Sequence, residues 1–372
     1  MRLRRPPDCP PLPELPELAW RPLTEADAPA YARLCEACRV VDDGTEVTTE
    51  AIARRELTNP HAPIATNSAC LAAADGELVA YGMVMERLDG VRARHVFLWG
   101  LTHPSHRRRG IGTALVGWGE ARGREILAGQ PADLPRLLET FRDEVVTDAI
   151  GLHRRFGFRP VRWYHEMRRD LAEPIPPEPD LGPLRTICFE PAWAERVRLA
   201  HNEAFADHWG SEPLPADVFE RDFVGDPHFR ADLSFLVLDG DEPAGYTINY
   251  VAEEDWEATG VREGWIGQLG VRRPWRRRGV ATALLLRSMA AFRAAGLDTA
   301  SLGVDTENPT GAVGVYERVG FRPWKRFVRL AKALEQPAGR ADDRVPQRGK
   351  STEAEELSMD GGWSSDGGRS AP

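Results

Sequence analysis

The feature that most constrains this chain is a nine-residue segment that occurs twice. Residues 107–115 read RRRGIGTAL and residues 276–284 read RRRGVATAL, with the glycines Gly110 and Gly279 lying 169 positions apart. A second repeated signature, Gly-Phe at 157–158 and 320–321, recurs after 163 positions. Two features with such similar separations indicate a duplicated unit. A chain of 372 residues is long enough for two domains of ordinary size.

The pattern around each copy predicts the same order of elements. Apolar strand-like stretches at 95–101 and 265–271 precede the two copies, and helical patterns at 111–127 and 280–295 follow them. Hairpins with Asp-Gly turns precede both strands, and each unit closes with a further strand. The predicted divisions are an irregular lead-in at 1–17, a first domain at 18–170, a proline-rich linker at 171–183, a second domain at 184–332 and a disordered tail at 333–372.

Composition excludes several classes of function. The net charge of −9 disfavours nucleic-acid binding, so the arginine clusters fit a small polyanion better. No long uncharged apolar run predicts a membrane span, and no apolar segment follows the basic N-terminus as in a secretory signal. Five cysteines are consistent with a cytoplasmic location. We interpret the Cys35-x-x-Cys38 pair as one face of a helix and predict no metal site, because no second ligand pair accompanies it.

The repeated segment has the chemistry of a pyrophosphate-binding loop. A glycine turn between strand and helix lets the backbone approach a phosphate, and the first N–H groups of the helix point toward it. In the second copy Gly279 and Ala281 leave this room, and the arginines Arg276 to Arg278 add positive charge. The alternative is a basic helix start that binds nothing.

On these residues both halves resemble the GNAT N-acetyltransferase superfamily, whose hallmark is Q/R-x-x-G-x-G/A between strand and helix. The resemblance covers 18–170 and 182–331. It implies an α/β fold of two tandem GNAT-like domains, each a splayed mixed sheet flanked by helices, and acetyl-CoA as donor. It also implies the cofactor-binding residues Leu269, Gly270 and Val271 on the strand, Arg276, Arg277, Arg278, Gly279, Val280, Ala281 and Thr282 in the loop, Asn308 on the cofactor arm, and Arg107, Arg108, Arg109, Gly110, Ile111, Gly112 and Thr113 in the first copy.

The two halves differ in the residues that complete a transferase site. Asn308-Pro309 and then Tyr316 match the second signature of the family, so the resemblance implies Tyr316 as the catalytic residue near the CoA sulfur. A tyrosine hydroxyl supplies a proton to a leaving thiolate. The alternative for Tyr316 is simple packing of a helix on the sheet. In the first half His153 stands at the equivalent position and the Asn-Pro pair is missing. We therefore expect the first half to retain CoA binding without efficient transfer.

No residue identifies itself as the general base. Glu263, Asp305 and Glu254 are candidates, and a water relay is an equal alternative. The Val271 N–H is a candidate to polarise the thioester carbonyl. The resemblance places Asn202, His208 and Trp209 near the acceptor. An acidic run at 253–257 suits either a cationic amine or an exposed hairpin tip, and the second interpretation is favoured.

The function predicted from the sequence is an acetyl-CoA-dependent N-acetyltransferase. It acts on the primary amine of a small molecule by direct attack, in the second half of the chain. No cysteine motif suits an acyl-enzyme. One alternative, suggested by the tandem arrangement, is an activity like that of mycothiol synthases on a cysteinyl pseudodisaccharide. The other is a CoA-binding regulator or scaffold with little catalysis. The partner is a small-molecule amine, with no nucleic acid or membrane, and the chain is a monomer or a homodimer.

Overall fold

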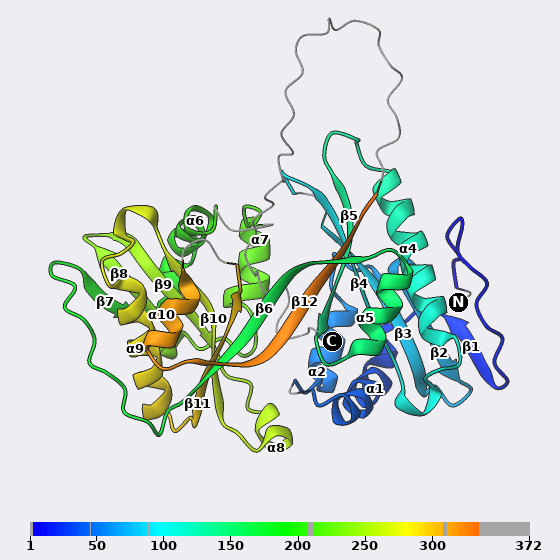
Figure 1. The fold of residues 1–372 in the computed structure, drawn as a ribbon, viewed down its shortest axis with the longest axis horizontal. Coiled ribbons are helices and arrows are strands. Elements are labelled where there is room, and N and C mark those ends of the chain that lie inside the picture. Colours follow the sequence, from blue (N-terminus) through cyan, green and yellow to red (C-terminus); the bar gives the residue numbers. More distant parts are fainter. Residues whose placement is uncertain (1–2, 45, 88–89, 207–210, 308–310, 335–372) are drawn as a thin grey trace, which may run out of the picture.

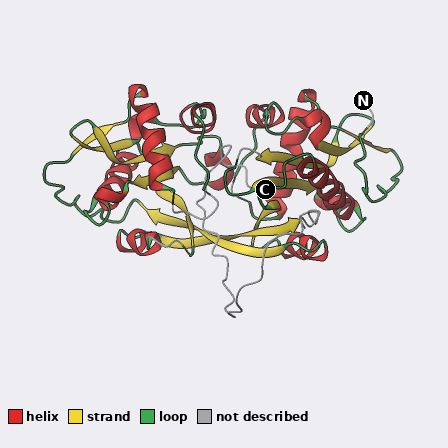
Figure 2. Cartoon of the chain, turned by 90° about the horizontal axis from the view of Figure 1, so that it is seen from above, coloured by secondary structure: helices red, strands yellow, loops and turns green. Residues whose placement is uncertain are grey.

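The computed structural model describes residues 3–44, 46–87, 90–206, 211–307 and 311–334. We call residues up to 170 the first half, 171–183 the linker and 184–334 the second half. Two lobes of similar build share one continuous sheet, with helices on both of its faces (Figures 1 and 2). The predicted α/β fold with tandem mixed sheets is therefore confirmed.

The first half contributes strands β1 to β6 and helices α1 to α5. They are β1 (Leu18–Arg21), α1 (Ala28–Val41), α2 (Glu50–Leu57), α3 (Ile64–Asn67), β2 (Ser68–Ala73), β3 (Leu78–Arg87), β4 (Arg94–Thr102), α4 (Ile111–Ala128), β5 (Arg136–Asp143), α5 (Thr147–Arg155) and β6 (Arg159–Asp170). A capping box precedes the first helix, with the Thr24 N–H donating to the Asp27 carboxylate at 2.7 Å. Two apolar clusters fill the faces of this lobe, one under α1 and α2 and one under α4.

The second half repeats this order. It contains β7 (Arg185–Cys188), α6 (Ala194–Ala204), α7 (Ala216–Phe219), β8 (Phe235–Asp239), β9 (Glu242–Tyr250), α8 (Asp255–Thr259), β10 (Glu263–Val271), α9 (Val280–Ala294), β11 (Thr299–Asp305), α10 (Ala312–Arg318) and β12 (Arg322–Leu334). The predicted hairpins, pre-loop strands and long helices all form. β5 is a strand that the sequence pattern did not predict. β12 continues to Leu334, so the predicted start of the tail at 333 falls within this strand.

The two halves exchange their closing strands. The order in the sheet is β1-β2-β3-β4-β5-β12-β6-β11-β10-β9-β8-β7, so β12 from the end of the second half lies beside β5 of the first. β6 from the end of the first half lies beside β11 of the second, and the two long strands pair antiparallel with each other in the middle of the molecule (Figure 1). The sheet is thus continuous because each lobe is completed by the other.

Buried ion pairs hold the exchanged strands. Arg329 on β12 donates to both carboxylate oxygens of Glu139 on β5, at 3.0 and 2.5 Å, and His95 on β4 contacts the same carboxylate at 2.8 Å. Arg162 on β6 donates to Asp305 on β11 at 2.9 Å. The Arg329–Glu139 and Arg162–Asp305 pairs each join a residue of one half to a residue of the other.

The lead-in and the linker have no regular secondary structure, and both pack on the lobes. Pro10 lies against Gly117 of α4, while Leu171 and Leu181 lie on the apolar clusters of the second half. The two cysteines of the C-x-x-C pair lie on α1, where Cys38 is buried and Cys35 is half-buried. This agrees with the prediction that they share one face of a helix. Within the described ranges no helix is both long enough and apolar enough to cross a membrane. Residues 335–372, which belong to the tail predicted at 333–372, lie outside the described residues.

Candidate functional site

Each lobe contains a split between two parallel strands. β10 and β11 pair from Glu263 to Ile266 and then diverge, while β10 continues to Val271 with β9 on its other side. The Arg272 N–H donates to the Ala244 carbonyl of β9 at 3.0 Å. Because bonded and non-bonded pairs alternate in an antiparallel ladder, the N–H groups of Leu269 and Val271 face the split. This edge has free donors for an extended ligand.

The first lobe has the same split. β4 and β5 pair from Arg94 to Phe97 before they separate. The His103 N–H donates to the Val79 carbonyl at 2.8 Å, so by the same alternation the main chain of Gly100 and Thr102 faces the split.

The two glycine loops have the same backbone conformation. The φ angles are 63° at Arg108 and 62° at Arg277, and 82° at Gly110 and 81° at Gly279. These glycines are the N-caps of α4 and α9. A left-handed conformation at a non-glycine residue is costly, and finding it at the same position of both copies shows that the loop geometry is specified. Both helix starts direct unpaired N–H groups at the loop, which is a favourable arrangement for a phosphate.

The first arginine of each loop binds main-chain carbonyls near the end of the preceding strand. The Arg276 guanidinium donates to the carbonyls of Val271 and Ala204, at 3.1 and 2.8 Å. Arg107 donates to the Thr102 carbonyl at 3.2 Å and binds Asp42 through both terminal nitrogens. These two side chains fix the end of the strand to the turn.

The other loop residues remain accessible in part. Arg108, Arg109, Gly110, Thr113, Arg277 and Arg278 are exposed, Gly112, Gly279, Ala281 and Thr282 are half-buried, and Ile111 and Val280 are buried in the cores. Arg108 is ion-paired with Asp148 at 2.5 Å. Space around the glycines differs: no atom lies within 4 Å of a Cβ built on Gly110, whereas Pro179 and Leu181 of the linker lie 3.5 and 3.6 Å from one built on Gly279. The linker therefore borders the second loop.

Tyr316 and His153 occupy equivalent places on α10 and α5. Tyr316 is buried in the apolar cluster that Leu269 also contacts, and burial raises the pKa of its hydroxyl to about 12. Among the described residues, none forms a hydrogen bond with this hydroxyl. His153 is 2% exposed, and burial, with Arg142 nearby, lowers its pKa to about 3. The ring is neutral at physiological pH, and its Nδ1 lies 2.8 Å from the Ala149 carbonyl oxygen.

The tautomer of His153 follows from that contact. A carbonyl oxygen only accepts, so the single proton of the neutral ring is on Nδ1 and Nε2 carries none. His153 therefore has no proton to give from its outer nitrogen, whereas the Tyr316 hydroxyl keeps its proton through the whole physiological range. Sequence comparison alone gave the replacement but not this difference in proton donation.

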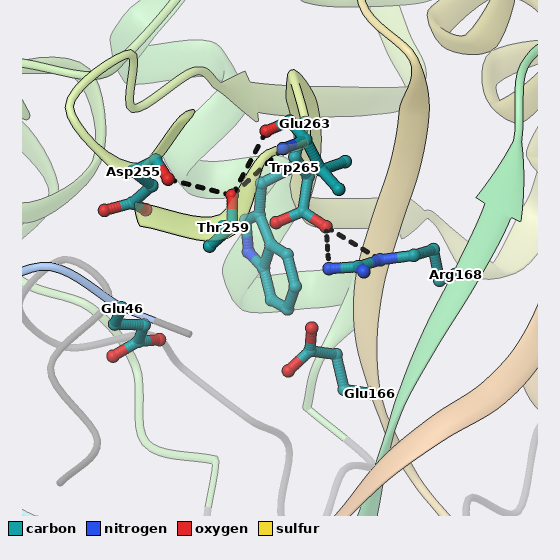
Figure 3. A pocket seen from close by; sticks show the side chains of 8 residues that line it. Glu46, Glu166, Arg168, Asp255, Thr259, Glu263 and Trp265 are labelled. Carbon is teal, nitrogen blue, oxygen red and sulfur yellow. Dashed lines mark hydrogen bonds and ion pairs between the residues drawn. The ribbon is translucent and has the colours of Figure 1, made fainter. Parts of the chain in front are cut away.

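The three candidate bases are all held in ion pairs. Glu263 accepts a hydrogen bond from Ser301. It also contacts Arg168 at 2.7 Å, in a pocket of about 20 Å³ that has room for little more than a water (Figure 3). Val271 lies eight positions further along the strand, roughly 27 Å away, so Glu263 is remote from the split. Asp305 lies at the end of β11 near the split and binds Arg162. Glu254 binds His228 at 2.5 Å, beside the same remote end of β10.

The candidate acceptor residues are only partly described. Asn202 uses both ends of its amide on Leu214, donating to its carbonyl at 3.2 Å and accepting from its N–H at 2.8 Å. It thus supports a loop. His208, Trp209 and Asn308 lie outside the described residues. The acidic run at 253–257 is not an exposed hairpin tip, because Asp255 is 8% exposed and accepts from the Val47 N–H of the first half.

Comparison with known proteins agrees with this geometry. The model of the acetyltransferase (GNAT) family matches residues 32–158 and 194–321. The chain belongs to the acetyltransferase (GNAT) family, and it is an acyltransferase. Enzymes of this family generally use acetyl-CoA.

Similar proteins share the tandem arrangement. The mycothiol acetyltransferase of Salinispora arenicola is 31% identical over 317 residues, covering 82% of this chain and 94% of that protein. The mycothiol acetyltransferase of Salinispora tropica is 32% identical over 313 residues, covering 82% and 91%. A GCN5-related N-acetyltransferase from Sphaerobacter thermophilus has a TM-score of 0.68 at 28% identity, covering 87% of this chain and 97% of that one. A tandem GNAT protein from the clavulanic acid biosynthesis pathway has a TM-score of 0.60 at 17% identity, which concerns the fold alone.

Proposed function

We propose that the chain transfers the acetyl group of acetyl-CoA to the primary amine of a small molecule, and that the second half carries out the reaction. The observation that carries the proposal is the difference between Tyr316 and His153. The tyrosine retains a free hydroxyl proton beside the split, whereas the histidine has committed its only proton to Ala149.

The residues of the second split fit the cofactor. Its diphosphate would lie at the helix start between Arg277 and Thr282, where the N–H groups are unpaired and two arginines are exposed. Its extended arm would pair with the strand edge formed by Leu269 and Val271. The cofactor supplies an acyl group activated as a thioester. Asn308 stays a candidate for a contact on the arm.

The chemical step needs a neutral amine, a polarised carbonyl and a proton for the leaving sulfur. The amine nitrogen bonds to the carbonyl carbon while the carbon–sulfur bond breaks. The Val271 N–H faces the split, which supports its role as the group that polarises the carbonyl. Tyr316 donates its proton to the leaving thiolate, and the proton lost by the amine leaves through a base. Asp305 is the candidate base nearest the split, and a water relay is the alternative.

The acceptor class follows from the relatives. Two proteins more than 30% identical over most of the chain are named mycothiol acetyltransferases. An amine of the mycothiol type, on a cysteinyl pseudodisaccharide, is therefore the first acceptor to test among small primary amines. The first half, with its intact loop and open Gly110, would bind a second CoA without transfer.

The test is release of CoA thiol from acetyl-CoA with a panel of primary amines that includes the cysteinyl pseudodisaccharide. We expect release with at least one amine, in equal amount to the acetylated product. Tight CoA binding with no release for any amine would instead favour the alternative of a CoA-binding regulator.

A further inference from the structure

A cavity of about 490 Å³ lies in the first lobe, at the split between β4 and β5. Its walls include the aromatic rings of Tyr31, Tyr81 and Trp99 and the strand edge at Gly100. Residues of the second half, among them His228, close its other side. No sequence pattern indicated this cavity, because its walls come from segments as far apart in the chain as Tyr31 and Phe327.

The arginines that line this cavity differ in their pairing. Arg39 binds Glu36 through two nitrogens at 2.6 and 2.8 Å. Arg55 binds Asp226 at 2.6 Å, and Arg221 binds Asp222 at 2.5 Å in one of its contacts. Each of these three therefore has its charge neutralised by a carboxylate of the protein.

Arg142 is the exception among the described arginines of the wall. It lies on β5, is 7% exposed, and donates Nη1 to the carbonyl of its neighbour Phe141 at 2.7 Å. No carboxylate of the described residues forms an ion pair with it. Burial lowers the pKa of Arg142 to about 10, which still leaves it charged at physiological pH. A buried unpaired cation is costly, by several kcal/mol in general.

Two comparisons show that the fold does not require this charge. Arg329, on the neighbouring strand β12 and equally buried, is fully paired with Glu139. Val304 on β11 is the equivalent residue of the second lobe. It directly precedes Asp305, just as Arg142 directly precedes Asp143. An apolar residue therefore suffices at this position of the split.

We propose that the cavity of the first lobe is a binding site for a small carboxylate, with Arg142 as its counter-ion. The aromatic walls would hold the hydrocarbon part of the ligand, while the guanidinium would pair with the carboxylate at the split. The carboxylate has two possible sources. The first source is the far end of an acyl group carried on CoA, and this case rests on the proposed CoA binding of the first lobe. The second source is a free carboxylic acid, and this case does not depend on CoA binding.

Calorimetry on the full-length chain tests the proposal with matched probes. Succinyl-CoA is compared with butyryl-CoA, which has an acyl chain of the same length without the charge, and succinate is compared with succinamide. We expect either succinyl-CoA or succinate to bind about 10- to 100-fold more tightly than the neutral probe with which it is compared. Preference for succinyl-CoA identifies the acyl-CoA source, and preference for succinate identifies a free acid. Equal binding of charged and neutral probes in both pairs overturns the proposal.

The Arg142→Met variant provides the second arm, and Arg39→Met is the control because that arginine lines the same cavity with its charge already paired. We expect R142M to remove the preference for the charged probe and to raise the melting temperature without ligand, since it removes an unpaired buried charge. R39M should leave the preference intact. A melting temperature that falls in R142M with the preference retained indicates a structural role and overturns the proposal. Loss of acetyl-CoA binding by every form of the chain would instead count against the proposed function.

Discussion

Tyr316 lies edge-on against Phe321, with ring centroids 6.3 Å apart and planes at 66°. His153 makes the same contact with Phe158 in the first lobe, at 5.5 Å and 88°. The two lobes thus keep the aromatic packing of this corner and differ in the group that it presents. Because the aromatic packing is the same and only the functional group differs, matched substitutions at Tyr316 and His153 can be compared directly.

Replacing Tyr316 by phenylalanine keeps that ring contact and removes the hydroxyl. We expect kcat for CoA release to fall about 100-fold, with KM for acetyl-CoA changed less than about threefold, because the variant loses a proton donor and not a binding contact. Steady-state kinetics at saturating amine measures both. The matched control is His153→Phe, which should leave kcat unchanged. An inactive H153F beside a fully active Y316F would assign the reaction to the first half.

A carboxylate introduced at the first turn of α4 or α9 separates the two CoA sites. Thr113→Glu and Thr282→Glu occupy equivalent loop positions, and an acidic residue at a helix start favours the helix itself while repelling a diphosphate. We expect calorimetry to find two CoA molecules per wild-type chain and one in each variant. Only T282E should abolish turnover. If T113E retains the wild-type stoichiometry, the first loop does not bind CoA.

Removing Arg329 should destabilise the sheet where the strands are exchanged. Arg329→Met leaves the Glu139 carboxylate buried with His95 alone, and breaking such a pair costs about 3–5 kcal/mol. Urea unfolding followed by circular dichroism measures the loss. Arg326→Met on the same strand is the control: its pair with Glu144 is exposed at 3.2 Å, and we expect a change below about 1 kcal/mol. Equal effects of the two variants would show that the buried pair adds nothing.

Acid should weaken the same contact in a defined range. Burial by itself would raise the pKa of the Glu139 carboxyl, but Arg329 and His95 outweigh it and lower the pKa to about 2. A folded-state pKa below the unfolded value of about 4.3 means that the charged pair stabilises the fold above that pH. This stabilisation is lost as the pH falls toward 2. The free energy of unfolding of the wild type should therefore approach that of Glu139→Gln on going from pH 7 to pH 3. A constant difference between them would contradict the assignment.

The sequence predicted the elements whose patterns are local. The hairpins and the glycine loops form where their residues indicated, because each depends on neighbours in the chain. β5 was missed because Glu139 and Arg142, which interrupt its apolar pattern, are buried there. The Glu139 carboxylate is neutralised by Arg329 on β12 and contacts His95 on β4. No sequence pattern reveals such long-range pairing.

The site was predictable to the same extent. The equivalence of Tyr316 and His153 follows from the alignment of the repeats. The proton position on His153 depends instead on its contact with the Ala149 carbonyl in the folded chain. The exchange of β6 and β12 could not be predicted from the sequence either. The two halves have the same strand pattern, so each closing strand could pair equally well within its own half or with the other half.

That exchange has a consequence for synthesis on the ribosome. β5 is complete at Asp143, but its neighbour β12 begins at Arg322, about 180 residues later. At about 5–20 residues per second the nascent first lobe waits on the order of 10 to 40 seconds for the strand that covers its edge. During that interval β6 is the only closing strand already made, so a transient pairing of β5 with β6 would have to be undone before the mature order forms. The sheet therefore cannot reach its mature strand order in either lobe until β12, the last strand, has been synthesised.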